Sequence, residues 1–192
     1  MPLADALAQM ASFRDAPPPG YRYSCIEDFV LRRGAVFASR DIDDRDSIAL
    51  PAMNFARRQC FYNAQMAAVS NPELVYVEGY MLRFIPILHA WLSYRGAVVD
   101  LTLRTGARVR GRLGNRVWGR FTDSEYIGVA FPDTAMLRRR MVVSGYASSL
   151  LDDHVNNYPA LRGEYDGQET VSVSRRQGDG RDRGRGEPVP GA

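Results

Sequence analysis

The chain contains no lysine, and all 25 of its basic residues are arginine. A genome rich in guanine and cytosine explains this bias. Selection against lysine, in an enzyme that handles lysine amines, is the alternative explanation. The formal net charge is only +3, which is too small to indicate nucleic-acid binding by itself. Charge therefore leaves the partner of the chain open.

Long apolar runs and a secretory signal are also missing. No stretch approaches the ~18 consecutive apolar residues that would indicate a membrane-spanning helix. The start, MPLADALAQM, has neither a basic region nor a long apolar segment, so we expect no secretory signal. The two cysteines, Cys25 and Cys60, are too few for a disulfide framework. We therefore expect reduced thiols and a cytoplasmic protein.

The 192 residues are 45% hydrophobic, which is enough to bury one ordinary core. We expect residues 1–20 to form a short amphipathic helix and a proline-rich connector. Residues 21–173 are expected to form the single folded domain. Residues 174–192 are dominated by glycine, arginine, aspartate and proline, which predicts a disordered Arg/Gly-rich tail.

Local patterns predict a mixed α and β content. Apolar residues recur at helical spacing in several segments, and other segments are rich in β-branched and aromatic residues. A capping pattern at Ser24 indicates the start of one helix. The predicted helices then cover about 24–33, 54–70, 134–142 and 146–157, and the predicted strands cover 74–84, 87–94, 97–101 and 125–131.

The stretch from Arg57 to Thr102 carries three side chains suited to thiol chemistry, in the order Cys60, His89 and Asp100. A cysteine becomes a strong nucleophile when it is held as a thiolate beside an imidazolium. A carboxylate on the other ring nitrogen fixes the orientation of the imidazole. The residue types therefore predict a nucleophile, a general acid and base, and an orienting group.

The spacing around Arg95-Gly96 predicts how two of these residues meet. A two-residue turn at this position places Trp91 opposite Asp100 on neighbouring strands. His89 is then a diagonal neighbour of Asp100 on the same face of the sheet, within reach of a long side chain. We therefore predict contact between His89 and Asp100.

Other residues are weaker candidates for the same site. The backbone N–H of Cys60 is one candidate donor to a developing oxyanion. The side-chain amides of Asn54 and Gln59 are two more. Tyr80 and Trp91 are candidate cleft walls, and Trp91 could also shield the imidazole from water. The chemistry requires no cofactor. The cysteines and histidines lack the paired spacing of a zinc site, and His154 is expected to lie on the surface.

This central stretch resembles the transglutaminase-like branch of the papain-like cysteine enzymes. The resemblance lies in four blocks: a cysteine followed by small residues at 60–64, YVEGY at 76–80, HAW at 89–91 and VVDLT at 98–102. It implies an α+β core with the Cys60 helix packed on an antiparallel sheet, and catalytic roles for Cys60, His89 and Asp100. The chain differs from the family at Leu101, where proline is common, and beside Cys60, where tryptophan is common.

The family resemblance implies a hydrolase or acyltransferase that acts on an amide or isopeptide bond of a protein or peptide-like substrate, through an acyl-thioester on Cys60. The compact stretch also resembles small proteins of bacteria and their phages. The family includes crosslinking enzymes, peptidases, amidases and inactive members, so both hydrolysis and acyl transfer remain open. No membrane partner is expected.

A second hypothesis rests on the arginine-rich segment 104–120. Its arginines alternate with apolar or small residues, which is typical of an exposed strand with one charged face. Such a face could bind nucleic acid or an acidic protein. The chain would then be a catalytically inactive binding protein of the same fold, and a solvated loop beside the active site is the other interpretation. The arginines concerned are Arg104, Arg108, Arg110, Arg112 and Arg116.

Overall fold

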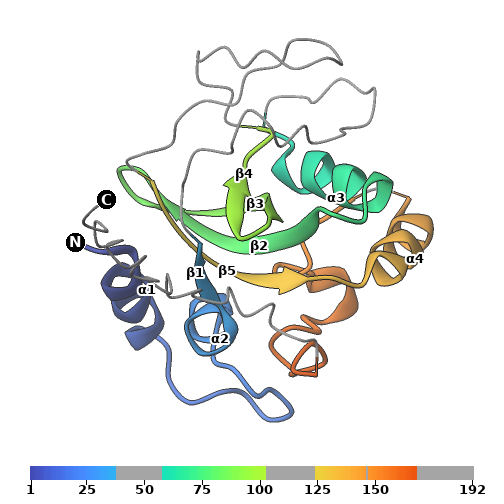
Figure 1. The fold of residues 1–192 in the computed structure, drawn as a ribbon. Helices are drawn as coiled ribbons and strands as arrows, with labels where there is room; N and C mark the ends of the chain where they lie inside the picture. Colours follow the sequence, from blue (N-terminus) through green and yellow to red (C-terminus); the bar gives the residue numbers. More distant parts are fainter. Residues whose placement is uncertain (38–57, 103–123, 146, 168–192) are drawn as a thin grey trace, which may run out of the picture.

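The fold is taken from a computed structural model, which describes residues 1–37, 58–102, 124–145 and 147–167. Over these residues the chain is α+β, with four α-helices and one curled antiparallel sheet of five strands (Figure 1). The elements are α1 (Leu3–Ser12), α2 (Ile26–Arg33), β1 (Ala35–Phe37), α3 (Cys60–Ser70), β2 (Val75–Leu82), β3 (Pro86–Tyr94), β4 (Ala97–Val99), β5 (Glu125–Phe131), α4 (Thr134–Ser144) and the 3₁₀ turn η1 (His154–Asn156).

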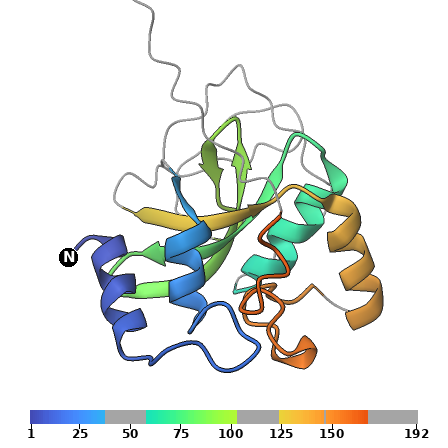
Figure 2. The ribbon, with the colours of Figure 1, turned by 90° about the horizontal axis from the view of Figure 1, so that it is seen from below.

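The strands are arranged in the order β1-β5-β2-β3-β4. One face of the sheet carries Tyr76, Tyr80, Leu92 and Phe131, and these side chains share a core with buried residues of all four helices. Figure 2 shows the helices around the sheet from a second direction. The other face holds a smaller buried cluster: Phe37, Val77, Met81, Trp91, Val98, Tyr126 and Ala130. Both faces of the central strands are therefore buried.

The β3–β4 hairpin has the predicted register. Tyr94 pairs with Ala97 and Leu92 pairs with Val99, across the turn at Arg95-Gly96. Both turn residues have positive φ angles, 48° and 78°, as a two-residue type I′ turn requires. Because β4 ends at Val99, it pairs with only three residues of β3. The chain leaves the sheet immediately before Asp100.

Two helix starts differ from the sequence prediction. The central helix begins at Cys60, because Arg58 has a φ angle of 63° and Gln59 is also non-helical. Residues 54–57 of the predicted helix lie outside the described part of the chain. The second helix is preceded by Cys25 as its N-cap residue rather than by Ser24. The carboxylate of Asp28 accepts the backbone N–H of Ser24 at 3.0 Å.

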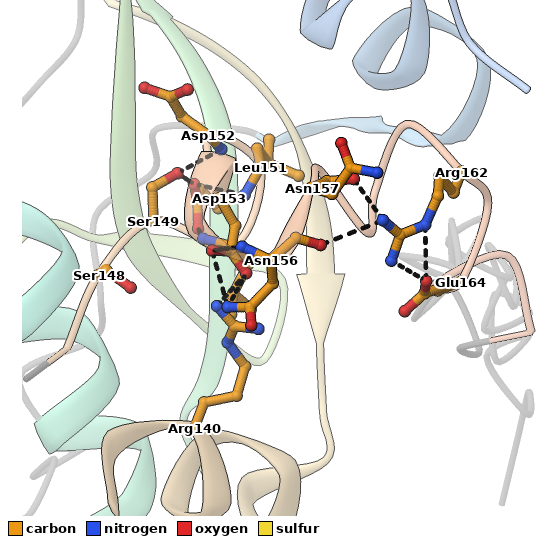
Figure 3. A network of polar contacts seen from close by, with 12 residues as sticks. Arg140, Ser148, Ser149, Leu151, Asp152, Asp153, Asn156, Asn157, Arg162 and Glu164 are labelled. Atoms are coloured by element: carbon orange, nitrogen blue, oxygen red, sulfur yellow. Dashed lines mark hydrogen bonds and ion pairs between the residues drawn. The ribbon is translucent and has the colours of Figure 1, made fainter. Parts of the chain in front are cut away.

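The predicted helix over 146–157 is wrong where the structure describes it. Residues 147–153 have no helix, and η1 is a single turn. The backbone N–H groups of Leu150 and Leu151 donate to the buried carboxylate of Glu78, at 2.8 and 3.1 Å, in place of helical bonds. Further along, Asp153 accepts from Asn156 and forms an ion pair with Arg140 of α4 (Figure 3). Long-range polar contacts fix this segment.

The strand β1 was not predicted, since three residues carry too little pattern to be recognised. It pairs with β5 through Val36 and Ile127 and lies at the sheet edge opposite β4. Among the described residues, no helix has the length and apolar character needed to cross a membrane.

Candidate active site

Cys60 is the first residue of α3, and its side chain is half-buried. The first backbone bond within this helix runs from the N–H of Asn63 to the carbonyl of Gln59, at 2.9 Å. The N–H groups of Cys60 and the next two residues therefore have no partner within the helix. No side chain of the described residues caps this helix start. The thiol lies at the positive end of a helix, where a negative charge is stabilised.

His89 and Asp100 form a close buried pair. Nε2 of His89 lies 2.6 Å from Oδ2 of Asp100, and the two residues are 5% and 2% exposed. The diagonal contact predicted from the hairpin register is therefore present. Because Nε2 faces Asp100, Nδ1 is the ring nitrogen that Asp100 leaves open, and interaction with Cys60 also raises the pKa of His89.

Burial alone would lower the pKa of His89, because it disfavours the charged ring. Hydrogen bonds with Asp100 and Cys60, and the negative charges of those groups, outweigh burial and raise the pKa to about 10. The ring is therefore an imidazolium at neutral pH. An imidazolium between a carboxylate and a thiol favours the thiolate form that nucleophilic attack requires.

Asp100 is held by more than His89. Its Oδ1 accepts the backbone N–H of Thr102 at 2.9 Å, and the hydroxyl of Tyr126 lies 3.4 Å from its Oδ2. Burial, followed by the charge of Asp100, raises the pKa of Tyr126. Tyr126 therefore stays a neutral donor toward the carboxylate.

Trp91 lies beside the histidine, on the same face of β3. The ring centroids of Trp91 and His89 are 6.4 Å apart and the planes differ by 21°. The indole is fully buried, and its Nε1 has no hydrogen-bond partner in the part of the chain that the structure describes. The structure thus brings Trp91 to the pair, as expected of a side chain that keeps water from the imidazole.

The other candidates lie elsewhere or outside the described residues. Gln59 directly precedes α3, is exposed and makes no capping bond. Tyr80 projects from the opposite face of the sheet to His89, and its hydroxyl donates to Glu27 of α2 at 2.5 Å. The structure therefore does not bring Tyr80 to the site.

His154 is exposed, as expected. Asn54 and the arginines of segment 104–120 are not among the described residues.

Asn63, Thr102 and Tyr126 contact the site but were not among the sequence candidates. Asn63 was detectable in principle, because it lies three residues after Cys60 and is polar in a largely apolar stretch. The contact of Tyr126 with Asp100 was not, since it depends on how β5 is placed in the sheet.

Neither a metal centre nor a known relative helps to interpret the site. No group of three or more histidine, cysteine or acidic side chains suited to a metal ion occurs among the residues described. Comparisons of the chain with protein-family models, curated proteins and solved structures found no match. The functional interpretation of the chain therefore depends on the geometry of Cys60, His89 and Asp100.

Proposed function

We propose that this chain is a transglutaminase-like cysteine enzyme with a papain-like core, acting on an amide or isopeptide bond. The observation that carries the proposal is the buried contact of His89 with Asp100, together with the interaction of Cys60 with His89 that raises the pKa of the ring. The start of α3 at Cys60 supports it further, because it adds helix N–H groups at the sulfur.

The reaction follows from these contacts. The Cys60 sulfur attacks the carbonyl carbon, and the carbonyl electron pair moves to oxygen. Backbone N–H groups at the start of α3 stabilise that oxyanion. As the carbon–nitrogen bond breaks, the His89 imidazolium gives its proton to the leaving amine. This leaves an acyl-thioester on Cys60 and a neutral imidazole.

Neutral His89 then takes a proton from the group that resolves the thioester. Water as that group gives a carboxylic acid and hydrolysis, whereas a second amine gives acyl transfer. Hydrolysis is favoured, because an acyl-enzyme meets water unless an acceptor site excludes it. Asp100 holds the ring throughout and stabilises its charged form. The substrate is a protein or peptide-like amide.

The competing hypothesis is an inactive protein of the same fold that binds nucleic acid or an acidic protein through the arginine segment 104–120. The reactivity of Cys60 separates the two hypotheses, and the chain provides its own reference thiol. Cys25 is 9% exposed, and burial raises the pKa of its thiol. The groups that act on it are Asp28, Glu27 and Ser24, and no histidine is among them.

We therefore predict that iodoacetamide alkylates Cys60 faster than Cys25 by a factor of about 100, the lower range for general acid–base assistance. Mass spectrometry of the two tryptic peptides over time measures both rates. His89→Ala should remove most of the difference, and His154→Ala, at the exposed second histidine, should leave it unchanged. Equal and slow labelling of both thiols in the unmodified protein would contradict the enzyme proposal. Faster labelling of Cys25 would reveal unfolding of a variant.

A further inference from the structure

Asn63 is a fully buried carboxamide on the helix that carries Cys60. It lies three residues after Cys60, so both side chains project from neighbouring positions of the first turns of α3. Its Nδ2 donates to the Thr102 hydroxyl at 3.0 Å. Burial of an amide group costs free energy unless the group is hydrogen-bonded. Because the Asn63 side chain is away from solvent, its hydrogen bond to Thr102 matters for stability.

Thr102 continues the connection to the candidate site. Its backbone N–H donates to Oδ1 of Asp100, while Oδ2 of the same carboxylate contacts His89. Each oxygen of Asp100 thus has a different partner, and the two bonds fix the plane of the carboxylate. The hydrogen bonds form a chain that runs from Asn63 on α3 through Thr102 and Asp100 to His89, whose pKa Cys60 also raises.

Such a link is needed because of where Asp100 lies. β4 ends at Val99, so in the part of the chain that the structure describes its pairing with β3 stops before Asp100. Cys60, in turn, lies on a helix that packs on the sheet through small apolar residues such as Ala64 and Ala67. The hydrogen bond from Asn63 is directional, so it fixes the first turns of α3 relative to Thr102.

We propose that Asn63 and Thr102 are positioning residues of the candidate site. They tie the helix of Cys60 to the carboxylate of Asp100, and thereby set how His89 lies between the two. The meaning of this link for catalysis rests on the proposed function. Its effect on the ionisation of His89 does not.

Gln65 provides the matched control. It lies on the same helix, is 1% exposed and also carries a buried carboxamide. Its Nε2 donates to the hydroxyl of Tyr76 at 3.2 Å and to the carbonyl of Ser148 at 2.6 Å, away from Asp100. Substitution of Gln65 removes comparable buried bonds from α3 but leaves the bonds from Asn63 to His89 intact.

The test compares Thr102→Val, Thr102→Ser and Gln65→Met in the full chain. Valine has the shape of threonine and keeps the backbone N–H, but lacks the oxygen that accepts from Asn63. Serine keeps that oxygen. Asn63→Leu is a second way to break the same bond. The measurements are the NMR titration of the His89 ring, the iodoacetamide rate of Cys60 and the urea midpoint of unfolding.

We expect Thr102→Val and Asn63→Leu to slow Cys60 alkylation about tenfold, as a small misplacement of reacting groups does. The His89 titration should shift down toward its ordinary range. Thr102→Ser should restore both, and Gln65→Met should lower the urea midpoint with little effect on either.

An unchanged His89 titration and Cys60 rate in Thr102→Val would overturn the proposal. Equal losses in Gln65→Met would also overturn it, because they would show a general effect of loosening α3. If Cys60 reacts no faster than Cys25 in the unmodified protein, the proposed function fails, while the His89 titration still decides the role of Asn63 and Thr102.

Discussion

The ionisation of His89 depends on two specific contacts that oppose the effect of its surroundings. A histidine this deeply buried would by itself become neutral, yet hydrogen bonds with Asp100 and Cys60 raise its pKa to about 10. Its charge at neutral pH therefore depends on its interactions with these two residues. Removal of one partner should be visible both in reactivity and in the pH dependence of folding.

We predict that the stabilising effect of Asp100 falls with rising pH. His89 has a pKa of about 10 in the folded chain and an ordinary value of 6.5, so it holds its proton more tightly when folded. The resulting stabilisation is complete below pH 6.5 and is lost as pH rises toward 10. The difference in unfolding free energy between the unmodified protein and Asp100→Asn, measured with urea, should therefore be large at pH 6 and should shrink by pH 10. A difference that is independent of pH would contradict the shift.

Some contacts of the candidate site could be predicted from nearby residues in the sequence, and others could not. His89 and Asp100 could be paired from the sequence because one short turn, Arg95-Gly96, fixes the register between them. The link between Asn63 and Thr102 could not be predicted, because it joins a helix to a strand end 39 positions away. The sequence pattern does not predict which side chain of a helix contacts which residue of a distant loop.

At the scale of elements, two glycines pair with each other in the central strands beside His89. Gly79 pairs with His89 on one side and with Gly128 on the other. A Cβ added at Gly128 would lie 2.6 Å from Cη2 of Trp91 and 2.9 Å from the carbonyl oxygen of Glu78. The absence of a side chain at Gly128 therefore makes the space in which the Trp91 ring lies next to His89.

Gly128→Ala should destabilise the fold by about 1–3 kcal/mol, the usual cost of forcing a methyl group into a packed core. It should also disturb the stacking of Trp91 on His89, which near-ultraviolet circular dichroism of the tryptophan would detect. Gly167→Ala is the control, because a Cβ there meets no atom within 4 Å. Equal urea midpoints for the two variants would show that the sheet relaxes around the added methyl group.

The elements could be predicted where the pattern is local. The helix over 134–142 and the strands over 87–94 and 125–131 follow from such patterns and agree with the structure to within a few residues. The region 147–153 did not follow its helical pattern, because Glu78 of β2 accepts two of its N–H groups and Ser149 also donates to that carboxylate. Burial raises the pKa of Glu78, while these bonds lower it. Both effects depend on residues about 70 positions apart in sequence, so the local sequence does not show them.

At the scale of the molecule, the fold brings together a helix start and a strand that are separated by β2 in sequence. The hairpin of β2 and β3 forms the middle of the sheet, and α3 packs against the same two strands. Cys60, the first residue of α3, is one of the groups that raise the pKa of His89 on β3. The α+β class was predicted correctly, and the papain-like assignment is part of the proposal.

The central claim is that Cys60, His89 and Asp100 act as one unit, and a double-mutant cycle on Cys60 alkylation tests it most directly. Residues that act as a unit have strongly non-additive effects. We predict that His89→Ala slows alkylation by about 100-fold and that Asp100→Asn slows it less. The double variant should react no more slowly than His89→Ala alone. Independent, multiplying effects of the two substitutions, or a Cys60 rate that neither changes, would contradict the account.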